Sequence, residues 1–558
     1  MMKRLFSLIW LFSIPLSFLS PSALADTPEA KILVNQAGYD LDGPKRVLLQ
    51  SNFDPREIHF YEITQGSAAF SQREWGETQY LDAWNLWYRE ANLPDLPAGE
   101  YRLLARWQGQ TVESPPVWIG TRRLSGRTGP LAAYFFYAQR CGAEVKGWHG
   151  PCHLDDARMR DGSHRDLSGG WHDAGDYNKY NGYTPLSVYA LARFAMSPAS
   201  RTTGWPRDQP GPVEEAMWGA RWLQKCQDPA AKKIIGRVYS GVRFWGRPED
   251  ETDQIPGNGD DRPVDVYDWN ENEMTVAAWS ALYRSTGDPA WRVLALGLWD
   301  VVEAYDLGFD LAMRAKRLLA AVELFRATGD QRFLIDSQNQ ATVILARQES
   351  DGAWPLWIMA LVDYGIIASA LAEFALAFPW SELASSVRNS LRRYLDFWES
   401  RMVQPFGIPQ WSGQDIFYPP LQDEWYVGQN SMYLSQAWAG LLISRVLGRE
   451  ESRARPWASG CLDWVLGVNP FGICLMNEAG SVHLPKNHHR YDRIPNGKNG
   501  IVPGAVLNGI IRLDSAHDLP YLDLLGNGWR TNEPWLPHNA YFLLALSEWD
   551  QKKSRSPF

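Results

Sequence analysis

This chain has no long run of charges of one sign, few cysteines and no low-complexity segment. Its 558 residues include 55 basic and 64 acidic side chains, which give a formal net charge of -9 without a long run of either sign. Nucleic acids and anionic membranes attract concentrated positive charge, so we expect neither as a partner. A neutral or polar partner agrees better with this composition, and we expect a monomer.

Long apolar runs are also scarce, and the clearest one stands near the N-terminus. There Lys3 and Arg4 precede the run LFSLIWLFSIPLSFL, and the small-residue sequence ALA ends at position 25. This order predicts a cleavable export signal over residues 1–25. No later run is long and apolar enough to cross a bilayer. We therefore expect a secreted or periplasmic product.

The chain has only five cysteines, and in an exported protein an odd number leaves at least one thiol outside a disulfide. Core material is not lacking, because 45% of the residues are hydrophobic. More than one domain is expected at this length, since single cores stop growing at about 250–300 residues.

The sequence pattern changes near residue 120. Over residues 26–120, short runs such as ILVNQAGY, RVLLQS and YRLLARW are separated by Asp, Gly and Pro, which predicts a small β-sandwich. Over residues 121–558, apolar residues recur at helical spacing, as in PVEEAMWGARWLQKCQ. Two helical segments end in Thr-Gly-Asp, near Thr286 and Thr328, where Gly ends one helix and Asp caps the next. Repeated helical hairpins favour a closed barrel or a solenoid of helix pairs.

An acidic pair marks the first candidate site. The segment SGGWHDAGDYNKYNGY places Asp173 and Asp176 on a glycine-rich loop. Two carboxylates on such a loop can converge on one water molecule, which a carboxylate base activates. The alternative is an Asp turn, in which each side chain binds local backbone N–H groups.

Two further candidates lie near the C-terminus. Glu533 is followed by Pro534 and Trp535, and burial beside such residues raises a carboxyl pKa, as a general acid requires. A helix-capping loop residue is the alternative. The sequence KNHHRYDR contains His488, His489 and Arg490, whose donors suit sugar hydroxyls or an anion, and a solvated basic turn is the alternative.

Together these segments resemble glycoside hydrolase family 9, a group of cellulases with an (α/α)6 barrel. The matching segments are GGWHDAGDYNKY, ARWLQKCQ, CLDWVLGVNPFG, HHR, and Asn532-Glu533 followed by Asn539-Ala540. The early segment ILVNQAGY also resembles the immunoglobulin-like domain that precedes the barrel in one branch of that family. The resemblance implies a multi-domain β plus α protein, with an immunoglobulin-like β-sandwich at 26–120 and an (α/α)6-barrel catalytic domain at 121–558.

The resemblance also implies hydrolysis with inversion at the anomeric carbon. Asp176 would be the catalytic base, Asp173 would help to hold the water, and Glu533 would be the proton donor. An inverting pair of carboxyl groups stands about 6.5–9.5 Å apart, which leaves room for that water. His488, His489 and Arg490 resemble the substrate-binding loop of the family, although Asn487 stands where proline is usual.

Four candidate metal ligands precede the acidic pair in the sequence: Cys141, Cys152, His153 and His172. Two thiolates and two imidazoles form a tetrahedral set that Zn²⁺ favours, and four protein ligands are typical of a structural site. A Cys141–Cys152 disulfide is the alternative in an oxidising compartment. The arrangement resembles the zinc-bearing branch of the family, which favours zinc as the element that fixes the aspartate loop.

Calcium is a second metal to consider, because it is common in the family that the sequence resembles. The acid-rich stretches PEDETDQ and NGDDRPVDVYD offer the oxygen ligands that Ca²⁺ prefers. A solvated acidic loop accounts for both stretches equally well.

Tryptophan is abundant, with 28 residues against 11 methionines. Aromatic faces stack on the C–H faces of sugars, although most tryptophans are expected in the core. The aromatic residues predicted to line a sugar-binding cleft are Tyr180, Trp245, Trp269, Trp354, Trp357, Trp411, Trp425, Trp529 and Trp535.

The first functional hypothesis is a secreted endo-β-1,4-glucanase acting on cellulose, soluble β-glucans or cello-oligosaccharides. The second is an exo-acting glycosidase on cello-oligosaccharides or glucosamine (chitosan) oligomers, because residues 230–420 contain bulky aromatics that would block a cleft. Asp268, Glu271 and Glu273 in that region would hold an amino sugar. The third is a non-catalytic carbohydrate-binding protein, which the presence of all three catalytic acids disfavours.

Overall fold

The computed structural model describes most of the chain. The described residues are 28–201, 205, 209–228, 233–239, 244–266, 272–355, 362–418, 427–448, 452–494 and 498–551. The predicted export signal lies outside them. Among the described residues, no helix combines the length and apolar character needed to cross a membrane.

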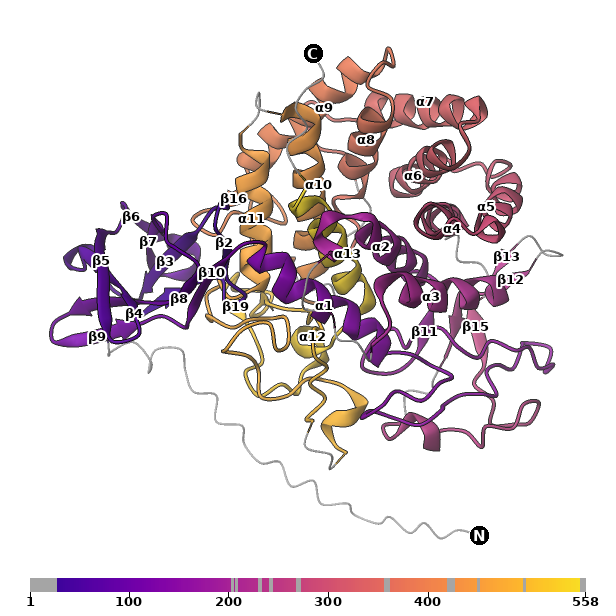
Figure 1. Cartoon of the computed structure of the whole chain (residues 1–558), viewed down its shortest axis with the longest axis horizontal. Helices are drawn as coiled ribbons and strands as arrows, with labels where there is room; N and C mark the ends of the chain where they lie inside the picture. Colours follow the sequence, from indigo (N-terminus) through magenta and orange to yellow (C-terminus); the bar gives the residue numbers. More distant parts are fainter. Residues whose placement is uncertain are drawn as a thin grey trace, which may run out of the picture.

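Two β-sheets form the N-terminal domain, which lies at the left of Figure 1. In the first sheet the strand order is β1 (Ala30–Leu33), β3 (Arg46–Ser51), β7 (Leu86–Asn92) and β6 (Thr78–Leu81), all antiparallel. In the second the order is β2 (Tyr39–Asp40), β10 (Val117–Gly120), β8 (Gly99–Trp107), β4 (Phe60–Gln65) and β5 (Ala68–Glu74), with β9 (Gln110–Glu113) also paired to β8. The predicted β-sandwich is confirmed.

Alternation along the strands explains how the two sheets pack. In β8 every second side chain is buried, beginning with Tyr101 and ending with Trp107. These residues share one apolar cluster with Ile32 and Val47 of the first sheet and with Ile63 of the neighbouring strand β4. A period of two places one face of each strand toward this cluster and the other toward solvent.

After the sandwich, the long helices of the described chain lie in two layers. The inner layer contains α2 (Thr184–Met196), α4 (Asn272–Thr286), α6 (Leu311–Thr328), α8 (Ile366–Ala377), α10 (Asn430–Leu447) and α13 (Leu536–Trp549). The outer layer contains α1 (Arg123–Ala138), α3 (Pro212–Cys226), α5 (Pro289–Val302), α7 (Gln331–Ala346), α9 (Ala384–Glu399) and α11 (Ala454–Val465). Most residues of the inner helices are buried, whereas outer helices such as α5, α7 and α9 expose one face to solvent.

The inner helices close into a ring. Each packs against the next in the order α2, α4, α6, α8, α10 and α13, and α13 returns to α2. An outer helix packs against each inner one, as α3 does against α2 and α11 against α10. Figure 1 shows this double layer to the right of the sandwich. The chain therefore forms the closed (α/α)6 barrel rather than the solenoid.

The two Thr-Gly-Asp motifs form the predicted helical hairpins. Gly287 and Gly329 adopt positive φ angles of 75° and 72°, which is the left-handed conformation that ends a helix. Asp288 and Asp330 then cap α5 and α7, and each accepts a hydrogen bond from the backbone N–H two residues later. Glycine and aspartate thus reverse the chain from an inner to an outer helix.

Short strands and one short helix lie in the loops that lead into the inner helices. A three-stranded antiparallel sheet contains β11 (Lys179–Tyr180), β14 (Arg237–Val238) and β15 (Val264–Val266). The other pairs are β12 (Gln227–Asp228) with β13 (Lys233–Ile234), β16 (Met402–Val403) with β17 (Ile408–Pro409), and β18 (Ile511–Arg512) with β19 (Pro520–Tyr521). The short helix α12 (Trp529–Asn532) lies just before α13.

The ILVNQAGY segment docks the sandwich onto the barrel. Asn35 donates through Nδ2 to Asp463 Oδ1 on α11 at 2.8 Å, and Gln36 donates through Nε2 to the carbonyl of Gly472 at 2.8 Å. Arg46 donates to the carbonyls of Pro405 and Phe406. This motif therefore serves the interface between domains.

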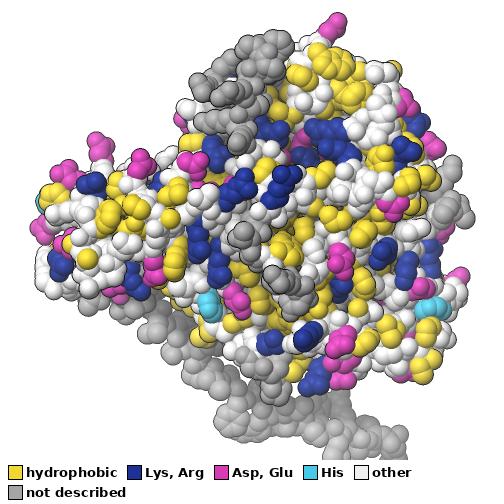
Figure 2. Space-filling view, in the orientation of Figure 1, with side chains coloured by type: hydrophobic (Ala, Val, Ile, Leu, Met, Phe, Trp, Pro, Cys, Tyr) yellow, Lys and Arg dark blue, Asp and Glu magenta, His cyan; other side chains and the backbone are white. Residues whose placement is uncertain are grey.

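Charged side chains of both signs are interspersed over the face of the molecule in Figure 2. Lys and Arg side chains lie among Asp, Glu and apolar side chains there, in keeping with the sequence, which has no long run of one sign.

Candidate active site

The aspartate loop immediately precedes the inner helix α2 and is held by close backbone contacts. Gly175, between the two aspartates, lies so near the chain at His488 that a Cβ atom there would stand 2.2 Å from the His488 carbonyl oxygen. Only glycine fits this approach. The glycine therefore brings the aspartates against the HHR segment.

Asp173 is held by the segment that carries Glu533. The indole N–H of Trp535 donates to Asp173 Oδ2 at 2.6 Å, and the backbone N–H of Leu536 donates to the Asp173 carbonyl at 3.0 Å. An isolated antiparallel bridge joins Ala174 to Trp535. Asp173 is buried, and its Oδ1 has no hydrogen-bond partner among the described residues.

Asp176 lies at the open side of the same loop and is partly exposed. Its carboxylate accepts hydrogen bonds from the backbone N–H of Asn178, at 3.2 Å, and from the Asn178 side-chain amide. These bonds orient the carboxylate while leaving it accessible, as a general base requires.

Glu533 lies between α12 and α13 and is also partly exposed. The adjacent Pro534 forms a bridge with Leu507, and the Glu533 carbonyl accepts from the backbone N–H of Asn508 at 2.9 Å. These backbone contacts fix the start of α13 beside the aspartate loop. The structure therefore brings Glu533 next to Asp173 and Asp176, which lie far from it in the sequence.

Burial raises the pKa of all three carboxyls, and charge repulsion adds to the rise at Glu533 and Asp173. Burial raises the pKa of Glu533 well above its usual range, and the charges of Asp176 and Asp173 raise it further. Burial likewise raises the pKa of Asp173 well above its usual range, with a smaller contribution from Asp176. Burial raises the pKa of Asp176 as well, but Asn178, Arg490 and His488 oppose that rise. Environments that separate the pKa values of neighbouring carboxyls assign one the acid role and another the base role.

The two histidines of the HHR segment have different surroundings. His488 is partly exposed and packs against the ring of Trp245, with centroids 4.7 Å apart. His489 is buried, and its Nδ1 accepts from the backbone N–H of Tyr491 at 3.2 Å. Its Nε2 lies 3.4 Å from Gln139 Oε1, and burial lowers its pKa to about 3, so it is neutral at physiological pH. His488 alone of the pair reaches the open side of the site.

Arg490 does not reach the open side of the site either. It is fully buried, its Nη1 donates to Glu251 Oε2 at 2.6 Å, and its Nε donates to the carbonyl of Asp176 at 3.1 Å. The structure thus gives His489 and Arg490 protein partners, and of the three residues predicted to bind substrate here only His488 is placed to do so directly.

Asn487 replaces the proline expected before the HHR segment without disturbing it. Its backbone N–H donates to the carbonyl of Asn499 at 3.1 Å, a bond that proline lacks the hydrogen to make. The substitution therefore ties the HHR loop to the neighbouring loop.

The predicted sugar-binding aromatics fall into three groups. Tyr180 is partly exposed, and its hydroxyl accepts from Arg237 at 3.0 Å. Burial raises its pKa, and the charges of Asp176 and Asp173 raise it further. Trp245, Trp411, Trp529 and Trp535 are partly exposed as well. Trp354 is a core residue, buried with its N–H donating to the Ile344 carbonyl, because it supports the turn after α7, so its prediction was wrong. The remaining candidates, Trp269, Trp357 and Trp425, lie outside the described residues.

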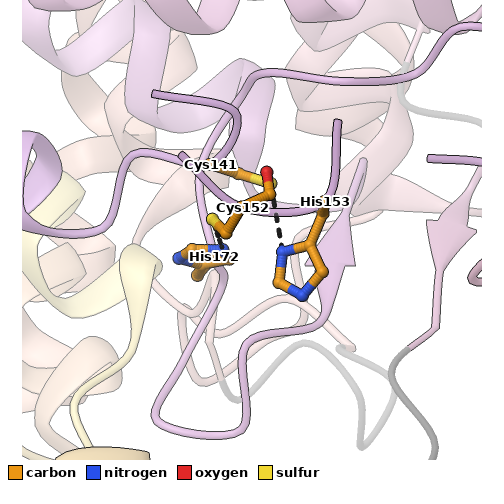
Figure 3. Close-up of side chains that lie close together, drawn as sticks. All are labelled: Cys141, Cys152, His153 and His172. Carbon is orange, nitrogen blue, oxygen red and sulfur yellow. Dashed lines mark hydrogen bonds between the residues drawn. The ribbon is translucent and has the colours of Figure 1, made fainter. Parts of the chain in front are cut away.

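The four predicted metal ligands converge in one buried cluster. The ligand atoms of Cys141, Cys152, His153 and His172 all lie within 4.8 Å of one another (Figure 3). Cys141 Sγ stands 3.6 Å from His153 Nδ1, and Cys152 Sγ stands 3.6 Å from His172 Nε2. In a tetrahedral zinc site with bonds of about 2.3 Å to sulfur and about 2.0–2.1 Å to nitrogen, neighbouring S and N ligands stand about 3.6 Å apart. Both cysteines are free thiols, which disfavours the disulfide.

A second cluster of candidate ligands contains Asp155, Asp260 and Asp261, within the acid-rich region considered for calcium. Asp155 is buried, and its Oδ2 has no hydrogen-bond partner among the described residues. Asp261 is engaged elsewhere, since its Oδ2 lies 3.0 Å from His164 Nδ1. Oxygen ligands of this kind suit a hard cation such as Ca²⁺.

Several residues that support the site were not predicted from the sequence. Lys179 of the aspartate motif is buried and pairs with Asp156 at 2.6 Å, as does Arg262. Arg262 also donates to the carbonyl of Tyr177 at 2.8 Å. The adjacent Asp155-Asp156 pair just after the metal ligands was the one signal in the sequence, because buried acids close to a motif lysine form ion pairs.

A family model described as glycosyl hydrolase family 9 matches residues 130–290 and 298–546. Endoglucanase D of Acetivibrio thermocellus is 24% identical over 448 residues, which cover 70% of this chain and 65% of that protein. A cellodextrinase of Butyrivibrio fibrisolvens is 29% identical over 173 residues, or 29% of each chain. The chain therefore spans less than two thirds of the length of these curated relatives.

Solved structures share the fold. The structure of AaCel9A in complex with cellobiose-like isofagomine has a TM-score of 0.70 at 22% identity, and the match covers 93% of this chain and 99% of that one. The cellulase Cel9M of C. cellulolyticum has a TM-score of 0.56 at 18% identity, covering 76% of this chain and 97% of that one. These likenesses support the β-rich N-terminal region followed by the (α/α)6 barrel.

Proposed function

Because this chain belongs to glycosyl hydrolase family 9, we propose that it hydrolyses β-1,4-glucosidic bonds with inversion at the anomeric carbon. The proposed substrates are cellulose, soluble β-glucans and cello-oligosaccharides, cleaved internally. The observation that carries this proposal is the set of three carboxyls whose surroundings raise the pKa of Glu533 and Asp173 more strongly than that of Asp176.

In the proposed reaction the three acids have separate tasks. Glu533 is protonated and donates its proton to the glycosidic oxygen as the bond to the anomeric carbon breaks. Asp176 is ionised and accepts a proton from a water molecule that attacks the opposite face of the sugar. Asp173, held by Trp535 through Oδ2, accepts a hydrogen bond from the same water through Oδ1. One water is consumed, and the product hemiacetal has the inverted configuration.

Zinc is the metal that we propose for the Cys141, Cys152, His153 and His172 cluster. The metal would act as a structural cross-link, because four protein ligands leave no open position for substrate. His172 directly precedes Asp173, so a metal there anchors the start of the aspartate loop. For the Asp155, Asp260 and Asp261 cluster we propose calcium, and elemental analysis of the purified protein tests both metals.

The alternative function is that of an exo-acting glycosidase on cello-oligosaccharides or glucosamine oligomers. The product analysis described below distinguishes it from the endoglucanase. Of its three acidic candidates, Glu273 is buried in the first turn of α4, away from solvent. Asp268 and Glu271 lie outside the described residues. The one described candidate, Glu273, is thus not exposed to bind an amino sugar, and we place glucans first.

Product analysis tests the proposed function directly. The full chain is incubated with carboxymethylcellulose, cellopentaose and chitosan pentamer, with Glu533→Ala as the inactive control. Rapid loss of viscosity with mixed oligomers is expected. Release of one sugar from one end would support the exo-acting alternative, and no turnover of any substrate would overturn both.

We further propose export by the N-terminal signal and a monomeric enzyme. Amino-terminal sequencing of the protein after expression with its own leader tests the first, with Asp26 as the expected first residue. Light scattering on the purified chain tests the second.

A further inference from the structure

The metal cluster is connected to the aspartate loop by a chain of hydrogen bonds that begins at His153. One ring nitrogen of His153, Nδ1, faces Cys141 Sγ inside the cluster (Figure 3). The other, Nε2, lies 3.0 Å from Glu251 Oε2. A carboxylate on the far nitrogen of a ligating histidine fixes its tautomer and ring orientation, and raises its basicity toward the metal.

Glu251 also binds the buried arginine of the HHR segment. Arg490 Nη1 donates to the same Oε2 atom at 2.6 Å, so one carboxylate oxygen serves both His153 and Arg490. The glutamate side chain is 7% exposed, and those of His153 and Arg490 are 0% exposed. Charge-assisted bonds of this kind are short and directional in a water-poor environment.

Arg490 completes the connection to the catalytic base. Its Nε donates to the backbone carbonyl of Asp176 at 3.1 Å, and its guanidinium lies over the ring of Tyr177, 5.2 Å from the centroid. Tyr177 in turn stacks on the metal ligand His172, with centroids 3.9 Å apart and rings within 11° of parallel. The base is thus held from two sides: Arg490 connects it to His153 through Glu251, and the neighbouring Tyr177 stacks on His172.

We propose that Glu251 and Arg490 are positioning residues that transmit the geometry of the metal centre to the backbone of Asp176. The proposal rests on the assignment of Asp176 as the base in the proposed function. Glu251 orients His153 and Arg490 together, and Arg490 fixes the carbonyl of Asp176. A displacement of a catalytic group by about 1 Å costs on the order of 100-fold in rate, so this connection matters for turnover.

The test compares Glu251→Gln with Asp250→Asn in the full chain. Both changes remove one carboxylate from the same segment, but Asp250 is exposed and lies outside this connection. Zinc affinity is measured by competition with a chromophoric chelator, and kcat and KM are measured on cellopentaose at saturating zinc. Amide hydrogen exchange of residues 173–178 reports the order of the aspartate loop.

For Glu251→Gln we expect zinc affinity to fall about 10–100-fold, which is typical when the partner of a ligating histidine is lost. At saturating zinc we expect kcat to fall by about tenfold or more with KM little changed, and the 173–178 amides to exchange faster. Asp250→Asn is expected to match the wild type in every measurement. A merely structural defect would lower thermal stability without this separation of kcat from KM.

A second variant tests the contact of Arg490 with Asp176 separately from the contact of Glu251 with the metal ligand His153. Arg490→Lys keeps the charge but cannot reach both Glu251 and the Asp176 carbonyl, so we expect reduced kcat with zinc affinity close to that of the wild type. If Glu251→Gln fails to fold, this variant and the exchange of residues 173–178 during zinc removal from the wild type decide the question.

Two results would overturn the proposal. The first is unchanged zinc affinity in Glu251→Gln. The second is wild-type kcat and loop exchange in zinc-saturated Glu251→Gln and Arg490→Lys. A wild type that binds zinc but hydrolyses no glycoside would instead contradict the proposed function, while the affinity and exchange measurements would still test the connection.

Discussion

The pKa values of Asp176 and Glu533 set the pH range in which the proposed reaction runs. Activity falls at low pH as Asp176 becomes protonated, and it falls at high pH as Glu533 loses its proton. Because both pKa values are raised, both limbs should lie above the ordinary carboxyl values of about 3.9 and about 4.3. The pH dependence of kcat/KM on cellopentaose measures the two limbs.

The Glu533→Gln variant tests whether the alkaline limb of the pH profile reports the ionisation of Glu533. Glu533→Gln cannot donate a proton, but an aryl cellobioside with a good leaving group needs little donation. On such a substrate the residual activity should lack the alkaline limb. An alkaline limb that persists in Glu533→Gln would remove Glu533 from the donor role.

The indole of Trp535 has a task beyond stacking on a sugar. Trp535→Phe keeps an aromatic ring but removes the N–H that holds Asp173 Oδ2 at 2.6 Å. We expect kcat to fall about 10–100-fold, because Asp173 then turns away from the attacking water. Steady-state kinetics on cellopentaose measure the change.

Trp549→Phe is the matched control for that change. Trp549 also donates through its indole N–H to a buried carboxylate, Asp40 Oδ2, at 2.7 Å, but it does so at the domain interface. Removing that bond should cost about 1.5–3 kcal/mol of stability and leave kcat unchanged. Equal effects of both variants on kcat would rule out a specific role for Trp535.

Short motifs in the sequence indicated the candidate acids and the candidate metal ligands that the structure brings together, but not the residues that hold them. Asp173 and Trp535 are 362 positions apart, and His153 and Glu251 are 98 apart. Nothing local in the sequence marks such contacts. The direction of the Arg490 side chain was not predictable for the same reason. Its motif predicts a hydrogen-bond donor but does not show that the donor binds Glu251 and the Asp176 carbonyl.

The inner helices are joined by buried ion pairs at the end of the barrel opposite the acids. Arg193 of α2 pairs with Glu323 of α6, Glu373 of α8 and Glu548 of α13, at 3.1, 2.6 and 3.0 Å. Arg284 of α4, Arg326 of α6 and Arg445 of α10 pair with the same glutamates. Every inner helix contributes to this network near its C-terminus, where positive side chains also suit the helix dipoles.

Loss of Arg193 should lower the free energy of unfolding of the barrel without changing kcat. Arg193→Met leaves three buried carboxylates short of a partner, and breaking a buried pair in this way costs about 3–5 kcal/mol. Arg332→Met, which removes an exposed arginine near Asp300 and Asp330, should cost at most about 1 kcal/mol. Denaturant unfolding measures the free energy of unfolding of both variants. A loss of kcat in folded Arg193→Met would show that the ion-pair network is not independent of the acids at the other end of the barrel.

Helical hairpins were predictable from the Thr-Gly-Asp motifs, whereas closure of the ring followed only from the family resemblance. A hairpin in a solenoid and one in a barrel bury the same faces locally, so helical spacing leaves both architectures open. The deciding contact is that of α13 with α2, the last inner helix with the first. That contact joins segments at opposite ends of the helical region, and no local pattern encodes it.

At the scale of the whole molecule, Arg46 and Asp463 join the two domains. Arg46 binds the carbonyls of Pro405 and Phe406 and lies 3.9 Å from Asp463. Burial raises the pKa of Asp463 to about 6, and Arg46 opposes that rise. A buried carboxylate with a raised pKa favours folding below that pKa and loses this contribution as the pH rises through it.

Arg46→Met should therefore destabilise the protein more at pH 8 than at pH 5. Without the guanidinium, no cation compensates the charge of ionised Asp463. We therefore expect the free energy of unfolding to fall by about 1–3 kcal/mol at the higher pH. Thermal unfolding at both pH values measures the difference. In the Asp463→Asn background the pH dependence of the loss should vanish, and its persistence there would assign the effect to another group.

The central claim is that Asp176 and Glu533 act across the glycosidic bond as an inverting pair, and the configuration of the first product tests it most directly. Proton NMR during hydrolysis of cellopentaose by the full chain resolves the anomers before they equilibrate. The account predicts that the α-anomer appears first, and that Asp176→Asn and Glu533→Gln form neither anomer at a comparable rate. Initial release of the β-anomer would contradict inversion, and with it the assigned roles of the two carboxyls.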